Sequence, residues 1–207
     1  RLADLEGVMT IELATPADAT LVPGDHVCGF YYGEEERDAL LLPFLREGFE
    51  SGAKCVAVVD STPPDEVVER IGGTPASVAS GQLEFYDSDQ TYLRGGAFDP
   101  DRMIAFWEGR AQEISDEGRF PSVRLLGEMS WLERVPPPRD AVVRYETWAD
   151  EFVSRCGQTC LCLYDLRRLG SGILMDLLRT HPKLLLGGLV LENPHHLSVD
   201  EFTATTG

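Results

Sequence analysis

The feature that most constrains the fold of this chain is a regular alternation of short apolar runs with longer stretches of helical spacing. Residues 54–60 are almost entirely apolar and rich in valine, which is typical of a strand buried on both faces of a sheet. Residues 35–50 carry apolar side chains at helical spacing, and Gly52 follows as a stop signal. Strands that alternate with helices of about ten or more residues form βαβ units. The pattern therefore predicts a doubly wound α/β fold, with a mainly parallel sheet and helices on both faces.

The same pattern continues along the chain. The predicted strands are residues 26–32, 54–60, 82–86, 122–128, 159–165 and 184–191. The last of these contains Gly187-Gly188 and is predicted either as one broken strand or as a hairpin. The predicted helices are residues 35–50, 63–71, 99–118, 139–155 and 172–180.

The chain has 207 residues, which is enough for one domain with a sizeable core. We predict that residues 21–202 form that single domain. Residues 1–20 are predicted as an N-terminal extension, and residues 203–207 as a frayed end or the start of a linker.

Several features are typical of a cytoplasmic protein. No run approaches the ~18 apolar residues of a membrane span, and the first residues lack a signal-peptide pattern. Five cysteines, an odd number, do not suggest the paired framework of a secreted protein. We therefore expect a cytoplasmic location.

Acidic side chains outnumber basic ones by 35 to 18, so the formal net charge is −17. Nucleic acids and anionic membranes attract proteins through clustered lysine and arginine, so we expect neither as a partner. Most of this acidity is interpreted as solvated surface. An alternative is a degenerate ATPase-fold interaction module whose acidic surface holds a basic protein.

The turn after the first predicted strand is where a doubly wound nucleotide-binding protein cradles phosphate. Here it reads Gly33-Glu34-Glu35-Glu36-Arg37, without the further glycines, the lysine and the Ser or Thr of a Walker loop. Three carboxylates would repel a triphosphate, and we interpret them as capping the helix N-terminus. A G-x-S-x-G elbow and an evident Ser/His/Asp triad are also missing. We predict no ATP hydrolysis, no catalytic residue and no enzyme activity.

A series of short motifs in a fixed order resembles one known family. The motifs are His26-Val27-Cys28-Gly29-Phe30-Tyr31, residues 44–52, Gly81-Gln82-Leu83, Tyr92, Phe98-Asp99, residues 124–131, Tyr145-Glu146, Cys162-Leu163-Tyr164-Asp165, His181-Pro182 and Asn193-Pro194. Together they span residues 24 to about 202, and the series is similar to the MEDS domain, the methanogen and methylotroph sensory domain.

The resemblance implies a RecA/KaiC-like core without the Walker A loop, acting as a sensory domain. Similar domains are regarded as binding small hydrocarbon derivatives beside transcriptional or kinase output domains, and some precede a histidine-kinase-like module in anti-sigma regulatory proteins. By this resemblance we expect the signal-input domain of a bacterial signal-transduction or transcription regulator. The expected partners are a small-molecule ligand and an output domain or regulatory protein, and the oligomeric state is left open.

Histidine and cysteine residues recur at alternate positions of two predicted strands. His26 and Cys28 share one strand face, as do Cys160 and Cys162, with Tyr164 continuing that row. If the two strands are neighbours, one histidine and three cysteines can converge as ligands of zinc or haem, and a metal- or haem-dependent redox sensor is an alternative function. The spacing is not that of a zinc ribbon, and buried cysteines commonly act as small apolar residues. We therefore predict no metal and no cofactor.

A second group of candidates lies at the carboxyl ends of the strands, where open α/β sheets bind ligands. Glu128 followed by Trp131 is the strongest of these, because a carboxylate beside an indole suits a polar or cationic molecule. The alternative is that Glu128 pairs with Arg124 or another arginine and Trp131 closes the core. The predicted ligand-binding residues are His26, Cys28, Phe30, Tyr32, Glu128, Trp131, Tyr164 and Asp165.

Two further motifs are interpreted structurally. Tyr145-Glu146 is predicted as a packing tyrosine beside an exposed neighbour, on a helix whose inward side chains are Val142, Tyr145, Ala149 and Phe152. His181-Pro182 is predicted to cap the preceding helix, because proline cannot continue it.

Overall fold

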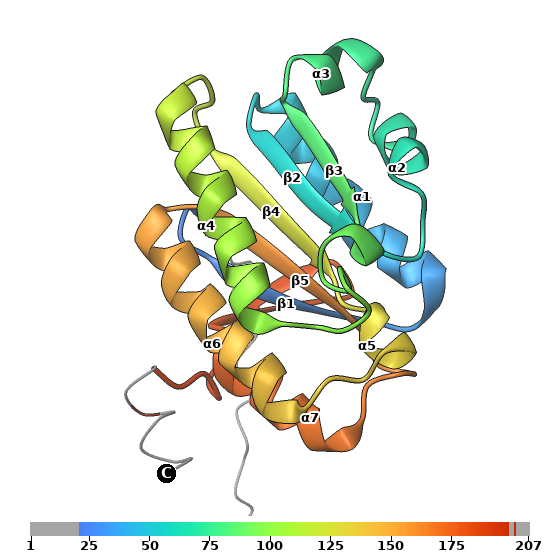
Figure 1. Ribbon diagram of the computed structural model, residues 1–207, viewed down its shortest axis with the longest axis vertical. Helices are drawn as coiled ribbons and strands as arrows, with labels where there is room; N and C mark the ends of the chain where they lie inside the picture. Colours follow the sequence, from blue (N-terminus) through green and yellow to red (C-terminus); the bar gives the residue numbers. More distant parts are fainter. Residues whose placement is uncertain (1–20, 199–200, 202–207) are drawn as a thin grey trace, which may run out of the picture.

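The computed structural model describes residues 21–198 and residue 201. These residues form one seven-stranded sheet with the strand order β3-β2-β4-β5-β1-β6-β7 (Figure 1). The strands are β1 (His26–Tyr31), β2 (Lys54–Val59), β3 (Leu83–Asp87), β4 (Val123–Glu128), β5 (Thr159–Asp165), β6 (Lys183–Leu186) and β7 (Leu189–Glu192). All neighbouring pairs are parallel except β6 with β7. The predicted mainly parallel sheet is confirmed.

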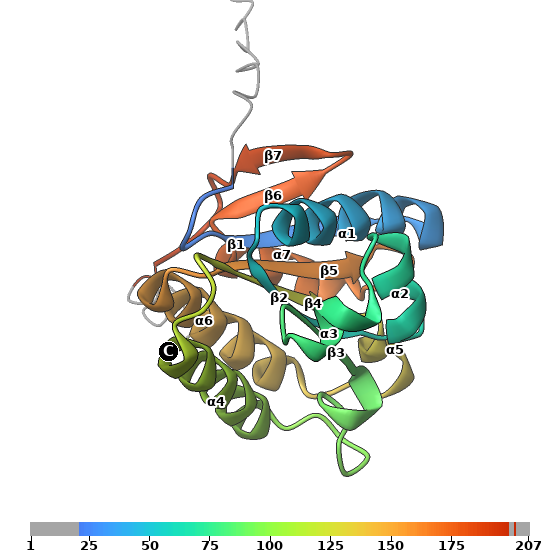
Figure 2. The same ribbon diagram turned by 90° about the horizontal axis from the view of Figure 1, so that it is seen from above.

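Helices cover both faces of this sheet (Figure 2). One face carries α1 (Gly33–Glu50) and α2 (Pro64–Arg70), and the other carries α4 (Pro100–Glu117), α6 (Arg139–Cys156) and α7 (Ser171–Thr180). Two further short helices, α3 (Pro75–Ala79) and α5 (Trp131–Arg134), and a 3-10 turn over Ser88–Gln90 were not predicted from the sequence. They span too few residues to show a helical period.

Side-chain alternation along the strands divides the core into two layers. Cys28 and Phe30 of β1 pack with Cys160, Cys162 and Tyr164 of β5 on the α4–α6–α7 face. Strand β1 pairs with β5 in parallel, with His26 opposite Cys160 and Cys28 opposite Cys162. The two strands are therefore neighbours, as the convergence of the histidine and the cysteines requires.

The turn after β1 has the structure expected for a helix that caps itself. The strand ends at Tyr31, one residue earlier than predicted, and α1 begins at Gly33, whose φ of 80° suits glycine. The carboxylate of Glu36 accepts a 2.7 Å hydrogen bond from the Tyr32 backbone N–H. A glutamate at this position satisfies a donor that the helix leaves free. The interpretation of the glutamates as capping residues is confirmed for Glu36.

The C-terminal strands form a hairpin. Gly187 and Gly188, with φ of 55° and 84°, connect antiparallel β6 and β7, and a two-residue turn with both φ values positive matches the twist of a hairpin. Of the two alternatives for residues 184–191, the hairpin is confirmed.

None of the helices in the described part of the chain is long and apolar enough to cross a membrane. Residues 1–20 and 203–207, predicted as an N-terminal extension and as a frayed end or linker, lie outside the described residues.

Candidate functional site

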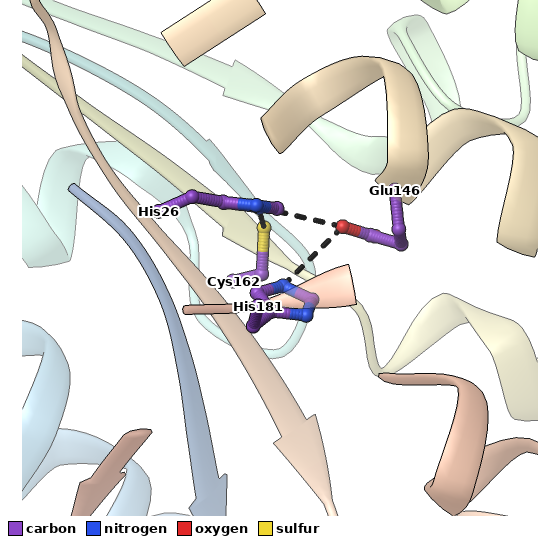
Figure 3. A group of neighbouring side chains, drawn as sticks. All are labelled: His26, Glu146, Cys162 and His181. Atoms are coloured by element: carbon purple, nitrogen blue, oxygen red, sulfur yellow. Dashed lines mark hydrogen bonds and ion pairs between the residues drawn. The ribbon is translucent and has the colours of Figure 1, made fainter. Parts of the chain in front are cut away.

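Four polar side chains from distant parts of the chain meet between the sheet and helices α6 and α7 (Figure 3). They are His26 on β1, Glu146 on α6, Cys162 on β5 and His181 directly after α7. All four are buried, and their candidate ligand atoms lie within 4.8 Å of one another. His26 Nε2 is 3.5 Å from both Cys162 Sγ and Glu146 Oε2, and His181 Nε2 is 3.4 Å from the same carboxylate oxygen. We call these four residues the buried centre.

The two strand residues reach the buried centre through the period of a β-strand. Successive side chains point to opposite faces, so His26 shares a face with Cys28, and Cys162 shares a face with Cys160. Because β1 and β5 are hydrogen-bonded neighbours in parallel register, both strands present these side chains to the same layer of the core.

The two helix residues are placed by α6 and by the end of α7. Glu146 lies four residues after buried Val142 and three before buried Ala149, within the inward stripe of α6. His181 is the C-cap of α7, as predicted, and Pro182 follows it. Its imidazole turns into the core and is fully buried.

Neighbouring groups hold the outer atoms of two of these side chains. His181 Nδ1 lies 2.8 Å from the Leu177 carbonyl oxygen, so the proton belongs on Nδ1 and the lone pair on Nε2. Glu146 Oε1 accepts a 2.5 Å hydrogen bond from the Tyr164 hydroxyl. Metal-bound histidines and carboxylates are oriented by the same kind of partner.

Two acceptor atoms of the buried centre face each other without a hydrogen-bond partner in the described structure. They are Glu146 Oε2 and His181 Nε2, which are 3.4 Å apart. Because the His181 proton lies on Nδ1, both atoms present lone pairs. A buried acceptor without a partner costs about 1–3 kcal/mol. A cation stabilises such a pair, either a proton carried by His26, whose Nε2 lies 3.5 Å from Glu146 Oε2, or a metal ion.

Burial changes the proton affinity of each of these groups. Burial and the neighbouring His26 lower the pKa of His181 well below its ordinary value, so this imidazole is neutral and keeps its lone pair. Burial raises the pKa of the Glu146 carboxyl. The hydrogen bond with Cys160, together with burial, raises the pKa of the Cys162 thiol well above its ordinary value. Without a metal ion, the buried centre therefore retains protons.

A further carboxylate, Asp150 of α6, faces the outer nitrogen of His26. Its Oδ1 atom lies 3.6 Å from His26 Nδ1. Burial by itself lowers the pKa of His26, but the carboxylate of Asp150 and the other negative groups nearby outweigh burial, so the net pKa shift is upward. His26 is thus oriented with Nδ1 towards Asp150 and Nε2 towards the buried centre.

Three of the distances between the four candidate ligand atoms fall in the range of a tetrahedral metal site, and all four atoms lie within 4.8 Å of one another. Zinc bonds of about 2.0–2.3 Å place neighbouring ligand atoms about 3.3–3.8 Å apart. Three distances in the buried centre are 3.4, 3.5 and 3.5 Å. Two imidazole nitrogens, a thiolate and a carboxylate are donors that suit Zn²⁺ and related divalent transition metals. Chemically, the buried centre is equipped to bind such an ion.

The predicted metal candidates are only partly brought together. His26 and Cys162 belong to the buried centre, but Cys28 packs into the apolar core. Cys160 Sγ lies 4.0 Å from Cys162 Sγ, and the four-residue group does not include it. Alternation along a strand identified the correct face, but only tertiary packing determines which side chains on that face meet.

The eight predicted ligand-binding residues are not gathered around one pocket in the described structure. The Tyr164 hydroxyl donates a hydrogen bond to the Glu146 carboxylate. Trp131 is fully buried, with its ring stacked on Tyr92 at a centroid distance of 5.0 Å. Tyr32, in contrast, is 59% exposed at the start of α1. For Trp131 the alternative interpretation, closure of the core, is the one that agrees with the structure.

Glu128 is engaged in internal contacts at the carboxyl edge of the sheet. Its carboxylate accepts hydrogen bonds from the backbone N–H groups of Asp60 at 2.7 Å and Ser61 at 3.2 Å. Arg37 of α1 approaches it to 3.4 Å. The sequence alternative named Arg124 or another arginine as its partner. The structure selects Arg37, whereas Arg124 instead donates to the Phe44 carbonyl, two turns further along α1.

Two other predicted residues also lie at this edge. Asp165 is paired with Arg167 at 2.7 Å and Arg168 at 3.4 Å. Phe30 lines an open hollow of about 500 Å³ between α1 and the β6–β7 turn. Glu36, Leu40, Leu166 and Leu186 are among the other residues that line it. This hollow offers space to a small molecule, as does a second hollow of about 410 Å³ beyond the ends of β4 and β5, lined by Leu132 and Leu169 among others.

Sequence reasoning missed two residues of the buried centre. Glu146 was predicted to be exposed, and this is wrong, since its exposed fraction is 0%. Its spacing from Val142 and Ala149 already placed it on the inward stripe, and that spacing was the available signal. His181 was interpreted only as a helix cap, and a histidine in a cap position carries no sequence signal of its ring's direction.

Two solved structures have the same fold. The flagellar accessory protein FlaH from Methanocaldococcus jannaschii aligns with 82% of this chain and 76% of its own, at a TM-score of 0.53 and 11% identity. A KaiC-like protein from Pyrococcus horikoshii OT3 aligns with 79% of this chain and 71% of its own, at a TM-score of 0.57 and 12% identity. A search of curated protein sequences returned no match. The fold is therefore that of a RecA/KaiC-like ATPase core.

Within this class, the family is also defined. Residues 25–182 match the model described as MEDS, the "MEthanogen/methylotroph, DcmR Sensory domain". The chain belongs to the MEDS family and is a sensory domain, as its motifs predicted.

The motifs that carried this resemblance converge in the structure. His26, Glu146, Cys162 and His181 each come from a different one of the short motifs, and all four meet in the buried centre. Segments that resemble the family, although far apart in sequence, thus contribute to one place in the fold.

Proposed function

We propose that this sensory domain receives its signal at the buried centre, by binding a divalent transition metal ion, with Zn²⁺ as the best match. The observation that carries the proposal is the pair of buried acceptors without a hydrogen bond, Glu146 Oε2 and His181 Nε2, within a set of four buried donor atoms that all lie within 4.8 Å of one another. His26, Cys162 and the two acceptors would supply all four ligands. The proposal departs from the prediction that the chain binds no metal.

The number of ligands determines what the site can sense. Four protein ligands complete a tetrahedral shell and leave no open position for a substrate or a further ligand. The signal is therefore the occupancy of the site itself. The ligands lie on β1, β5, α6 and the end of α7, so an ion would tie two helices to the sheet and favour one arrangement of them.

We further propose that this arrangement is passed to an output domain of a bacterial signal-transduction or transcription regulator, of the histidine-kinase-like or anti-sigma type. In this role the domain itself performs no catalysis.

A second candidate function is the binding of a small molecule, such as a hydrocarbon derivative, in the hollow beside Phe30. The hollow has a volume of about 500 Å³ and includes apolar side chains, and ligand pockets range over about 300–1,000 Å³. The buried centre ranks above it, because the described residues that line the hollow include no buried polar side-chain atom without a hydrogen-bond partner.

The test is a zinc titration of the chain after treatment with a chelator, followed by native mass spectrometry and thermal unfolding. We expect one Zn²⁺ per chain and a higher Tm, since free metal at 1,000 times Kd stabilises the folded state by about 4 kcal/mol. Replacement of zinc by Co²⁺ should give absorption bands of a tetrahedral thiolate complex. Failure to bind stoichiometric metal would overturn the proposal, and a bound organic mass would favour the hollow instead.

Metal affinity should rise with pH. The pKa of the Cys162 thiol is raised well above its ordinary value, so this thiol is protonated in the metal-free protein and its proton must leave when the ion binds. Each displaced proton changes the apparent affinity by about tenfold per pH unit. Chelator competition from about pH 6 to about pH 8, corrected for chelator protonation, measures this slope. An affinity that is constant over this range would contradict the role of the Cys162 thiolate as a ligand.

A further inference from the structure

The segment that follows β7 lies against the buried centre on two sides. We call residues 193–198 the strap. Its contacts with the rest of the domain involve backbone groups around His181 and the side chain of Asp150. Because these contacts lead to the end of α7 and the turn that carry His181, and to Asp150 beside His26, the strap is placed to respond to the state of the buried centre.

The first side is the turn between α7 and β6, which carries His181. The Asn193 side-chain amide donates to the carbonyl oxygens of Leu178 at 2.5 Å and His181 at 2.7 Å. The Asn193 backbone N–H donates to Pro182 at 2.9 Å, and the Leu197 N–H completes the attachment by donating to the Arg179 carbonyl, also at 2.9 Å. The strap is thus hydrogen-bonded to the backbone that positions His181.

The second side is the carboxylate of Asp150, which is shared by two histidines. Its Oδ2 atom lies 2.9 Å from His196 Nε2 of the strap, and its Oδ1 atom lies 3.6 Å from Nδ1 of His26. The side chains of Asp150 and His196 are 17% and 26% exposed, whereas that of His26 is 0% exposed. His196 therefore covers the Asp150 carboxylate on its solvent-facing side, away from the buried His26.

We infer that the strap reports metal occupancy of the buried centre, and that Asp150 is the positioning residue that couples it to His26. This inference rests on the proposed function. A metal ion on His26 Nε2 makes the Nδ1 proton a stronger donor, and carboxylates accept this proton in metal sites. The Asp150 carboxylate then moves within hydrogen-bond distance of His26 Nδ1. This holds the carboxylate in its contact with His196. An ion on His181 fixes the carbonyls to which Asn193 and Leu197 are attached.

The coupling has a defined consequence for the strap. With the metal ion bound, both of its attachments are rigid, and its backbone N–H groups are protected from exchange. In the metal-free protein the attachments loosen, and the strap opens locally with a lower free energy than the sheet. The strap is thereby more ordered when the metal ion is bound than when it is absent.

The test is hydrogen–deuterium exchange of the whole 207-residue chain, after chelator treatment and with or without added Zn²⁺. We expect the amides of Asn193, His196 and Leu197 to exchange at least about tenfold more slowly with zinc, because each donates a backbone hydrogen bond. Binding of zinc without any change in strap exchange would overturn the inference and leave the proposed function intact. Absence of zinc binding would instead overturn the proposed function.

Two adjacent histidines provide matched variants. His196→Gln removes the imidazole next to Asp150, whereas His195→Gln changes an exposed neighbour outside that contact. Both variants should bind one Zn²⁺ per chain, but zinc should protect the strap only in His195→Gln. If His196→Gln keeps the zinc-dependent protection of the unchanged chain, the coupling through Asp150 is wrong.

Discussion

Replacement of Cys162 by alanine is expected to lower the affinity for Zn²⁺ by more than about a hundredfold. Loss of a residue that only supports a ligand already costs about 10–100-fold in metal affinity, and Cys162 is expected to be a ligand itself. Its sulfur lies 3.5 Å from His26 Nε2, and it is the one thiol of the four-donor group. Chelator competition measures the affinity, and the Co²⁺ form should lose its thiolate absorption.

Cys28→Ala is the matched control for this experiment. Cys28 is also buried, lies on the same face of the sheet and sits opposite Cys162 in the β1–β5 register. It does not belong to the buried centre. We expect Cys28→Ala to keep the zinc affinity and the cobalt absorption of the unchanged chain.

The same pair of variants separates two ligand sets. Loss of binding in both Cys28→Ala and Cys162→Ala would favour the His26, Cys28, Cys160 and Cys162 set that alternation along the strands suggested, because both cysteines belong to that set. Retention of binding in both variants would remove the thiolate from the site altogether. Circular dichroism of each metal-free variant shows whether the fold is kept.

Replacement of Glu128 by alanine is expected to lower the free energy of unfolding by about 1–3 kcal/mol, the usual cost of leaving buried hydrogen-bond donors without their acceptor. Arg37 would keep its charge in a buried position, and the backbone N–H groups of Asp60 and Ser61 would lose their acceptor. Denaturant unfolding measures the change. Glu128 thereby serves to join the loops at the carboxyl edge.

The control for this prediction is Glu47→Ala. Glu47 is also paired with an arginine, Arg124 at 3.0 Å, but its side chain is 74% exposed. An exposed pair contributes at most about 1 kcal/mol, so Glu47→Ala should change stability little. A Glu128→Ala protein as stable as the unchanged chain, but impaired in binding a small molecule, would return Glu128 to the ligand-binding role that its place beside Trp131 suggested.

Much of the fold follows from local patterns in the sequence. The apolar run at residues 54–60 and the glycine pair at 187 and 188 each indicated an element that the structure contains, a buried strand and a hairpin turn. The short helix that begins at Trp131 was not predicted, because four residues cannot display a helical period. This short helix matters for the site, because it directs the Trp131 side chain into the core instead of into a pocket.

The buried centre could be predicted only in part. Alternation placed His26 and Cys162 on shared strand faces, and the structure has them 3.5 Å apart although 136 residues separate them in the chain. Glu146 was on a recognisable inward stripe, but a carboxylate is seldom buried unless it has partners. Those partners, Tyr164 and the two histidines, cannot be identified from the helix alone.

The sequence by itself determined the period and the order of the long helices and of the strands, and the family. These properties depend on neighbouring residues, or on motifs in a linear order, and require no knowledge of distant contacts. Only the tertiary structure decided which strands are neighbours, which way the ring of His181 turns, and that four motifs meet at one point. Such proximity depends on strand order and on the packing of α6 and α7 against the sheet, and both are set by contacts between residues far apart in the chain.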